Sequence, residues 1–84
     1  MQALDGNAVA GLLYEVFGGE MTTATGVCAG CGATWQVGEL RVYLRAPGTV
    51  VRCPACAAVL IVIVTRRGIN CVDLRGLSSL ELVP

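Results

Sequence analysis

The first apolar pattern in the chain has the spacing of a helix. Apolar residues recur there at intervals of three and four: Val9, Leu12, Leu13, Val16 and Phe17. This spacing puts them on one face of an α-helix. Asp5 or Asn7 can cap its start, and Gly18-Gly19 can end it. We therefore predict an amphipathic N-terminal helix over 5–18. It contains no cation, which favours packing on a sheet over docking to a partner or a membrane surface.

From Met21 onward the pattern changes to that of β-structure. Short segments rich in Val, Thr, Ile and Leu alternate with glycine-containing breaks. The predicted strands are 21–27, 33–37, 39–45, 49–53, 58–66 and 70–75. Ala46-Pro47-Gly48-Thr49 is a strong turn signal and predicts a hairpin. Arg67-Gly68-Ile69-Asn70 is a weaker one, and it predicts a C-terminal hairpin within 58–76.

One strand is apolar on both faces. Val59-Leu60-Ile61-Val62-Ile63-Val64 lacks the alternation of a half-exposed strand, so we expect both of its faces to be covered. The helix can cover one face. The other must meet a further sheet layer, a second copy of the chain or a partner, so a homodimer or a protein partner is expected here.

Composition then narrows the class of protein. The chain has 84 residues, of which 55% are hydrophobic and 14% charged, and six cations balance six acids with no histidine. We expect a single domain, 1–84, and exclude disorder, a strongly basic nucleic-acid arm and histidine catalysis. A core of this size is marginal, so a covalent or metal staple is expected.

The cellular compartment determines whether disulfides or a metal ion would stabilise the core. The first residues lack the basic segment of a signal peptide, and the longest apolar run, 55–64, is too short to cross a membrane. We therefore expect the reducing cytoplasm and no membrane, where cysteine pairs indicate metal more often than disulfides.

Four of the five cysteines form two identical motifs. Cys28 and Cys31 form one C-x2-C, Cys53 and Cys56 form the other, and 21 residues separate them. Two such turns supply four thiolates for a closed, tetrahedral structural zinc site. We predict one Zn²⁺ per chain in a zinc-ribbon core over 26–58. Iron remains the rival metal, since a tetrahedral sulfur site accepts either, although the chain has few aromatic residues and no strongly acidic character.

The residues after each motif are not equivalent. Gly32 lies where zinc-binding turns favour a left-handed residue, and Ala57 occupies the matching place in the second motif. A left-handed alanine costs about 1–2 kcal/mol relative to glycine. This is small beside the roughly 10–16 kcal/mol of structural zinc binding, so chelation is expected to unfold the protein.

Cys71 is left over. Its neighbours on one face of a strand would be Asp73 and Arg75, so it need not be in the core. A free structural thiol is the simplest interpretation. Regulatory oxidation and an intermolecular disulfide remain open.

A face of the predicted strand 39–45 carries arginine and tyrosine. Arg41, Tyr43 and Arg45 share it, and the predicted hairpin would bring Arg52 opposite Tyr43. Such a face can bind phosphates and stack a base. It can equally be a solvated surface in which the aliphatic stems of the arginines cover the tyrosine ring. Four thiolates with one Zn²⁺ would also give the loaded site a negative net charge, which argues further against nucleic acid.

No catalytic constellation is visible. The acids are scattered, the serines have no histidine base, and a zinc closed by four thiolates lacks the open position that catalysis needs. We expect the protein not to be an enzyme.

Three further segments carry a resemblance. Leu4-Asp5-Gly6-Asn7, Arg52-Cys53-Pro54 and Val72-Asp73-Leu74-Arg75-Gly76, with the two motifs, resemble a family of small uncharacterised bacterial zinc-ribbon proteins, a domain of unknown function. The resemblance covers nearly the whole chain. It implies a zinc ribbon with Cys28, Cys31, Cys53 and Cys56 as ligands, and it implies no activity.

The sequence thus predicts a small α+β protein, mostly β: a zinc ribbon with an N-terminal amphipathic helix, acting as a protein-interaction or regulatory adaptor. The alternative is a nucleic-acid-binding ribbon that uses Arg41, Tyr43, Arg45 and Arg52.

Overall fold

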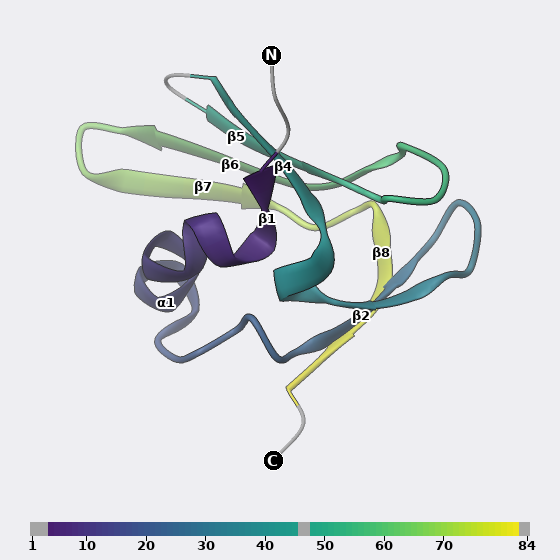
Figure 1. The fold of residues 1–84 in the computed structure, drawn as a ribbon. Helices are drawn as coiled ribbons and strands as arrows, with labels where there is room; N and C mark the ends of the chain where they lie inside the picture. The colour runs from purple at the N-terminus through teal and green to yellow at the C-terminus, as the bar shows by residue number, and fades with distance from the viewer. Residues whose placement is uncertain (1–3, 46–47, 83–84) are drawn as a thin grey trace.

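The structure, a computed structural model, describes residues 4–45 and 48–82. These residues fold into two antiparallel sheets and one short α-helix (Figure 1). The first sheet has the strand order β1-β4-β5-β6-β7, and the second has the order β3-β2-β8. The first sheet comprises β1 (Leu4–Asp5), β4 (Arg41–Arg45), β5 (Gly48–Arg52), β6 (Val59–Arg66) and β7 (Ile69–Asp73). The second comprises β2 (Thr25–Cys28), β3 (Thr34–Gln36) and β8 (Leu77–Glu81). The predicted class, a small α+β fold that is mostly strand, is confirmed.

The N-terminal helix is shorter than predicted. Of the predicted range 5–18, Asp5 belongs to β1, which was not predicted, Gly6–Val9 forms a 3₁₀ turn, and Ala10–Phe17 forms the α-helix α1. Asp5 caps the 3₁₀ turn, because its Oδ1 accepts from the Asn7 amide at 3.0 Å. Gly18 ends α1 in the left-handed conformation, as the sequence indicated.

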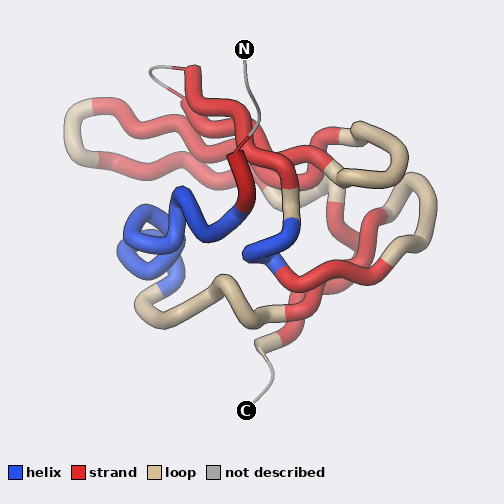
Figure 2. The backbone as a smooth tube through the Cα atoms, viewed as in Figure 1, coloured by secondary structure: helices blue, strands red, loops and turns tan. Residues whose placement is uncertain are grey.

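The core lies between α1 and the first sheet. Leu13 from the helix and Val42, Val51, Ile61 and Ile63 from the sheet are each at most 2% exposed. The helix therefore covers one face of the sheet, as Figure 2 also shows. The second sheet lies at the side and carries fewer buried apolar side chains.

The apolar strand β6 is covered on one face only, which differs from the prediction. Its inner residues Leu60, Ile61 and Ile63 are 1% exposed, whereas Val62 and Val64 are half-buried on the outer face. Two successive inner residues, Leu60 and Ile61, result from a bulge where β5 pairs with β6. Within the described residues, no further layer of strands or helix covers the outer face.

The hairpins form where the turns were predicted, with shifted ends. Arg45 pairs with Gly48 across residues 46–47, which lie outside the described residues, so β5 begins at Gly48. The second turn consists of Arg67 and Gly68, both at positive φ, and β7 begins at Ile69.

The segments before β2 and before β4 differ more from the prediction than the hairpins do. Residues 21–24 form a turn and not the start of a strand, and a 3₁₀ turn, Val37–Glu39, precedes β4. In that turn the side chains of Gln36 and Glu39 form a capping box. Met21 and Ala24 are buried, and the Val37 amide at the start of the 3₁₀ turn donates to the Ala24 carbonyl at 2.9 Å.

Candidate metal centre

Two loops with the same backbone geometry carry the four cysteines. The first knuckle, 28–33, connects β2 to β3, and the second knuckle, 53–58, connects β5 to β6. In the first, the Cys28 amide donates to the Ala33 carbonyl and the Gly32 amide to the Cys28 carbonyl, both at 2.9 Å. The same two bonds recur in the second knuckle at the same distance, from Cys53 to Ala58 and from Ala57 to Cys53.

Each knuckle needs one left-handed residue. Gly32 has φ 76° and Ala57 has φ 63°, as the sequence comparison of the two motifs predicted. The alanine carries a Cβ that disfavours this conformation. Its carbonyl accepts a hydrogen bond from Arg52 Nη1 at 2.8 Å, so the residue just before Cys53 holds the strained position in place.

The knuckles lie side by side and bring the sulfurs together. Figure 2 shows the two loops at one side of the molecule. The four sulfurs all lie within 4.8 Å of one another, and the pairs Cys28–Cys56 and Cys31–Cys53 are 3.7 Å apart. Four sulfurs placed 2.3 Å from a central zinc in a tetrahedron would be about 3.8 Å apart. The donor set therefore fits a tetrahedral metal ion.

The backbone of each knuckle stabilises a thiolate on its first cysteine. For Cys28, the amides of Cys31 and Gly30 lower the pKa against the effect of burial. For Cys53, burial raises the pKa, but the amides of Cys56 and Ala55 outweigh it and bring the value to about 6. Both sulfurs thus receive hydrogen bonds that favour their charged form.

The second cysteine of each knuckle behaves in the opposite way. The amide of Ala58 lowers the pKa of Cys56, but burial and the three neighbouring thiol groups raise it to about 12. The pKa of Cys31 is also raised, since burial and the thiols of Cys28 and Cys53 outweigh the amide of Ala33. Four thiolates in this space need a cation to neutralise them, which is what a metal ion supplies.

The site joins the two sheets. Cys28 ends a strand of the second sheet and Cys53 follows a strand of the first, and both are 1% exposed. Cys31 and Cys56 are exposed at the loop tips. Gly76, between β7 and β8, adds a backbone link, because its carbonyl accepts from the Ala29 amide at 2.9 Å.

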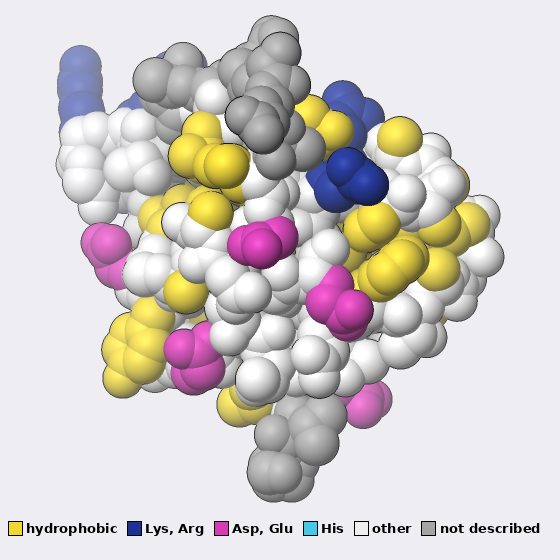
Figure 3. Space-filling model, in the orientation of Figure 1, with side chains coloured by type: hydrophobic (Ala, Val, Ile, Leu, Met, Phe, Trp, Pro, Cys, Tyr) yellow, Lys and Arg dark blue, Asp and Glu magenta, His cyan; other side chains and the backbone are white. Residues whose placement is uncertain are grey.

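The knuckle residues themselves are apolar or glycine, and one arginine, Arg52, contacts them through its hydrogen bond to the Ala57 carbonyl. Small side chains form the exposed tips of the knuckles, and a hydrophobic patch is visible on this side of the molecule (Figure 3). The exposed members are Ala29, Cys31, Ala55, Cys56 and Ala57. No charged residue occurs between 28 and 33 or between 53 and 58.

The predicted arginine–tyrosine face is only partly as expected. Arg41, Tyr43 and Arg52 do share the outer face of the first sheet, but Arg52 pairs with Arg41, and Tyr43 pairs with Val50. The predicted register was wrong because the hairpin closes on Arg45 and Gly48, one residue earlier than the predicted strand 49–53. The side chain of Arg45 lies outside the described residues.

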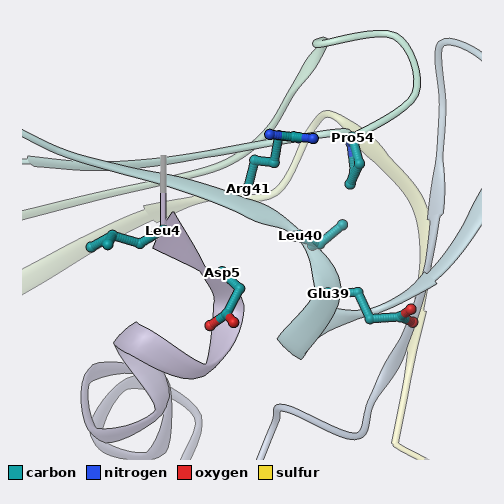
Figure 4. Close-up of a pocket in the computed structure, with 6 residues that line it drawn as sticks. All are labelled: Leu4, Asp5, Glu39, Leu40, Arg41 and Pro54. Atoms are coloured by element: carbon teal, nitrogen blue, oxygen red, sulfur yellow. The ribbon is translucent and has the colours of Figure 1, made fainter. Parts of the chain in front are cut away.

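A cavity of about 320 Å³ lies near this face, lined by Leu4, Asp5, Glu39, Leu40, Arg41 and Pro54 (Figure 4). Its two carboxylates serve the backbone. Asp5 caps the 3₁₀ turn, and Glu39 Oε1 accepts from the Gln36 amide at 2.9 Å. The sequence had indicated the capping role of Asp5, but it had not indicated that of Glu39.

The sequence identified the four cysteines but not the hydrogen bonds that hold the two knuckles in place. It assigned Arg52 to a binding surface, whereas the structure shows it donating to the Ala57 carbonyl. The sequence did contain a signal for this hydrogen bond: Ala57 occupies a position that favours a left-handed residue, and Arg52 directly precedes the ligand Cys53. The hydrogen bond from the Ala29 amide to the Gly76 carbonyl left no comparable signal, because it depends on the pairing of β2 with β8, which the sequence did not reveal.

Fold and site together define a small α+β protein with a four-cysteine centre that could bind a metal ion. Among the described residues, no helix has the length and apolar character needed to cross a membrane. The model of the Family of unknown function (DUF6510) matches residues 1–84, and the chain belongs to this family. No curated protein and no solved structure matches the chain.

Proposed function

We propose that the chain is a non-catalytic, zinc-dependent module of the reducing cytoplasm. The observation that carries this proposal is the arrangement of four cysteine sulfurs within 4.8 Å of one another. A site closed by four thiolates has no open position for a substrate, so its role is structural. Iron would fit the same sulfurs. Zinc is the proposed ion because the chain has few aromatic residues and no strongly acidic character, unlike an electron carrier.

Metal analysis tests this assignment directly. We expect a colourless protein that contains one zinc per chain, and we expect chelation to abolish its cooperative melting transition. The reason is that structural zinc supplies roughly 10–16 kcal/mol of apparent binding energy in small domains. A red iron-loaded protein, or a melting temperature unchanged after complete removal of zinc, contradicts the proposal.

We further propose that the module binds a protein through the outer face of the first sheet. Tyr43, Val50, Val62 and Val64 are half-buried there, in the middle of the sheet. Arg41 and Arg52 lie side by side at one end of this apolar centre, so the matching partner is a protein surface with an apolar middle and an acidic edge on one side. Nucleic acid is the weaker candidate, because one of the two arginines donates to the Ala57 carbonyl.

Two substitutions on this face test the proposal. Val62→Asp puts a charge in the apolar centre, and Arg41→Glu reverses an exposed charge; each is expected to weaken partner binding at least tenfold. Ser78→Asp, on exposed β8, is the matched control. Zinc content and melting temperature verify the fold of each variant.

The supporting result is a partner that the wild type and Ser78→Asp both retain after nuclease treatment and that both face variants lose. Binding that disappears with nuclease, or that weakens steeply with salt, assigns the face to nucleic acid instead. Equal binding by all four proteins removes the face from consideration.

A further inference from the structure

The strand β7 presents an open sheet edge on which only the last residue, Asp73, is charged. It ends the five-stranded sheet, and within the described residues no strand pairs with its outer side. Four consecutive residues, Ile69 to Val72, carry no charge, and Ile69 is 66% exposed. Proteins usually protect such an edge with charges, proline or a bulge, because its free amides and carbonyls invite another strand.

The other sheet edges differ from β7. The strand β1 has two residues and β3 has three, too few to form an extended ladder. The strand β8 has the same length as β7, but a bulge interrupts its pairing with β2, whereas the pairing of β7 with β6 is regular. The edge at β7 is therefore the one that offers a regular, bulge-free ladder to another strand.

The hairpin turn determines which backbone groups of β7 point outward. The turn residues Arg67 and Gly68 both have positive φ, which is the two-residue type I′ connection. In such hairpins the closing pair, here Arg66 and Ile69, is of the hydrogen-bonded kind, and the kinds alternate along the ladder. Cys71 therefore directs its backbone groups to β6, and Asn70 and Val72 direct theirs to the open edge.

These outward groups are complementary to themselves. In an antiparallel pairing centred on the middle of the five-residue strand, Asn70 lies opposite Val72 of a second copy, and the reverse pair forms by symmetry. Each of these is a hydrogen-bonded pair. The central pair is then Cys71 opposite Cys71 of the second copy, in a non-hydrogen-bonded position with Cα atoms about 4.5 Å apart. This lies within the 4.4–6.8 Å range that a disulfide spans.

We propose that two copies of this chain pair edge to edge along β7, with Cys71 at the two-fold axis. The pairing extends the first sheet to ten strands, and it does not depend on the metal or on the partner proposed above. Such a closed two-fold contact uses up the edge and limits assembly to a dimer.

The charges near the ends of the strand fit this arrangement. Antiparallel pairing places Asp73, whose side chain is 39% exposed, beside the turn of the second copy that carries Arg66 and Arg67. Asp73 already binds Arg75 of its own chain at 2.7 Å. A second cation on its other side completes an ionic contact at each end of the joined strands.

The contact is small, which makes it responsive to oxidation. Five residues from each copy are far fewer than the roughly 20–30 a side of a standard interface, so the thiol form pairs weakly. A disulfide such as oxidised glutathione can lock it in two exchanges. One Cys71 thiolate attacks it and releases one glutathione. The second Cys71 then attacks the mixed disulfide and releases the other, so two thiols become one disulfide.

The test measures cross-linking of the zinc-loaded protein by oxidised glutathione. We expect a Cys71-linked dimer that forms at least tenfold faster than in Glu15→Cys/Cys71→Ser, a control that moves the exposed thiol to the helix. Ile69→Cys/Cys71→Ser keeps the thiol on the same face of the same strand but out of register, and it is also expected to react at least tenfold more slowly.

A second measurement follows the pairing without the disulfide. In reductant, Cys71→Ser is expected to keep the weak, concentration-dependent dimer in sedimentation experiments. Val72→Pro is expected to lose it, because proline removes an outward amide and leaves the ladder to β6 intact. Zinc content verifies that this variant is folded. Equal cross-linking at positions 15 and 71, or a Cys71→Ser protein that stays monomeric at millimolar concentration, overturns the proposal.

Discussion

At the scale of single residues, the second knuckle shows how a strained position is maintained next to a ligand. Ala57 has φ 63°, where Gly32 has φ 76° in the first knuckle. The two loops otherwise make the same backbone hydrogen bonds. The asymmetry is offset by Arg52, whose guanidinium donates to the Ala57 carbonyl. Arg52 therefore acts on the site through the backbone and not through the metal.

This arrangement predicts opposite effects for two substitutions. Ala57→Gly relieves a left-handed strain of about 1–2 kcal/mol, less the entropy that glycine loses on folding, so a gain of about 0.5–1 kcal/mol in unfolding free energy is expected. Arg52→Gln removes the hydrogen bond and is expected to cost about 1 kcal/mol. Denaturant unfolding of the zinc-loaded protein measures both.

The matched control is Arg41→Gln, which removes an arginine from the same sheet face and is expected to change stability little. The double variant Ala57→Gly/Arg52→Gln should show coupling, with a smaller loss from Arg52→Gln once glycine relieves the strain. Additive effects, or an equal loss for Arg41→Gln, contradict the role assigned to Arg52.

At the scale of elements, regular patterns were predictable and interrupted ones were not. The sequence indicated the helix by its regular apolar spacing and by Gly18 at its end, and it indicated six strands by apolar, β-branched segments between glycine-containing breaks. It missed β8, whose residues Leu77 and Leu80 are three apart. A bulge at the pairing of Val27 and Cys28 brings both leucines against Gly26. Side chains on one face of a regular strand are two residues apart, so a spacing of three does not suggest a strand. Only the pairing with β2 identifies β8 as one.

Close backbone contacts explain two of the segments on which the family resemblance rested. A Cβ at Gly6 would lie 1.8 Å from the Val37 carbonyl oxygen, and one at Gly76 would lie 1.9 Å from the Val59 carbonyl oxygen. These glycines let the chain pass the 3₁₀ turn before β4 and the start of β6. The segments around them are therefore structural, and their packing partners are distant in sequence, which is why the sequence alone could not explain them.

The candidate site was predictable to a greater extent than the surface. Paired C-x2-C motifs fix a geometry locally, so two short motifs were enough to name all four sulfurs. The arginine–tyrosine face depended on the register of a hairpin, and a shift of one residue in its closing pair changed the neighbour of Arg52 from Tyr43 to Arg41. Register is set by contacts across the whole sheet, which a local pattern does not record.

At the scale of the whole molecule, the thiol groups connect metal binding to pH. The pKa values of Cys31 and Cys56 are raised, so both are protonated at pH 7 without metal, whereas Cys53, with a pKa of about 6, is ionised. Binding a metal must therefore release at least two protons. Acid competes with the metal, so affinity falls as pH falls.

The number of protons released determines how steeply the zinc affinity depends on pH. The apparent dissociation constant for zinc should rise at least about 100-fold for each pH unit lowered near neutrality. Calorimetry in buffers of different ionisation enthalpy measures the proton number directly. Cys71→Ser should give the same number as the wild type, because Cys71 lies outside the cluster. Release of one proton or none contradicts the predicted ionisation of the site.

The position of the site between the sheets has a consequence for how the chain divides its stability. The buried apolar side chains from strands of the first sheet include Val42, Val51, Leu60, Ile61 and Ile63, whereas the strands of the second contribute Cys28 alone. The second sheet thus has almost no buried hydrophobic core of its own. A bound metal ion would hold it together instead. Loss of that ion would release the second sheet first, and the cooperative transition that spans both sheets would be lost with it, so the supply of a metal would decide whether the chain is ordered.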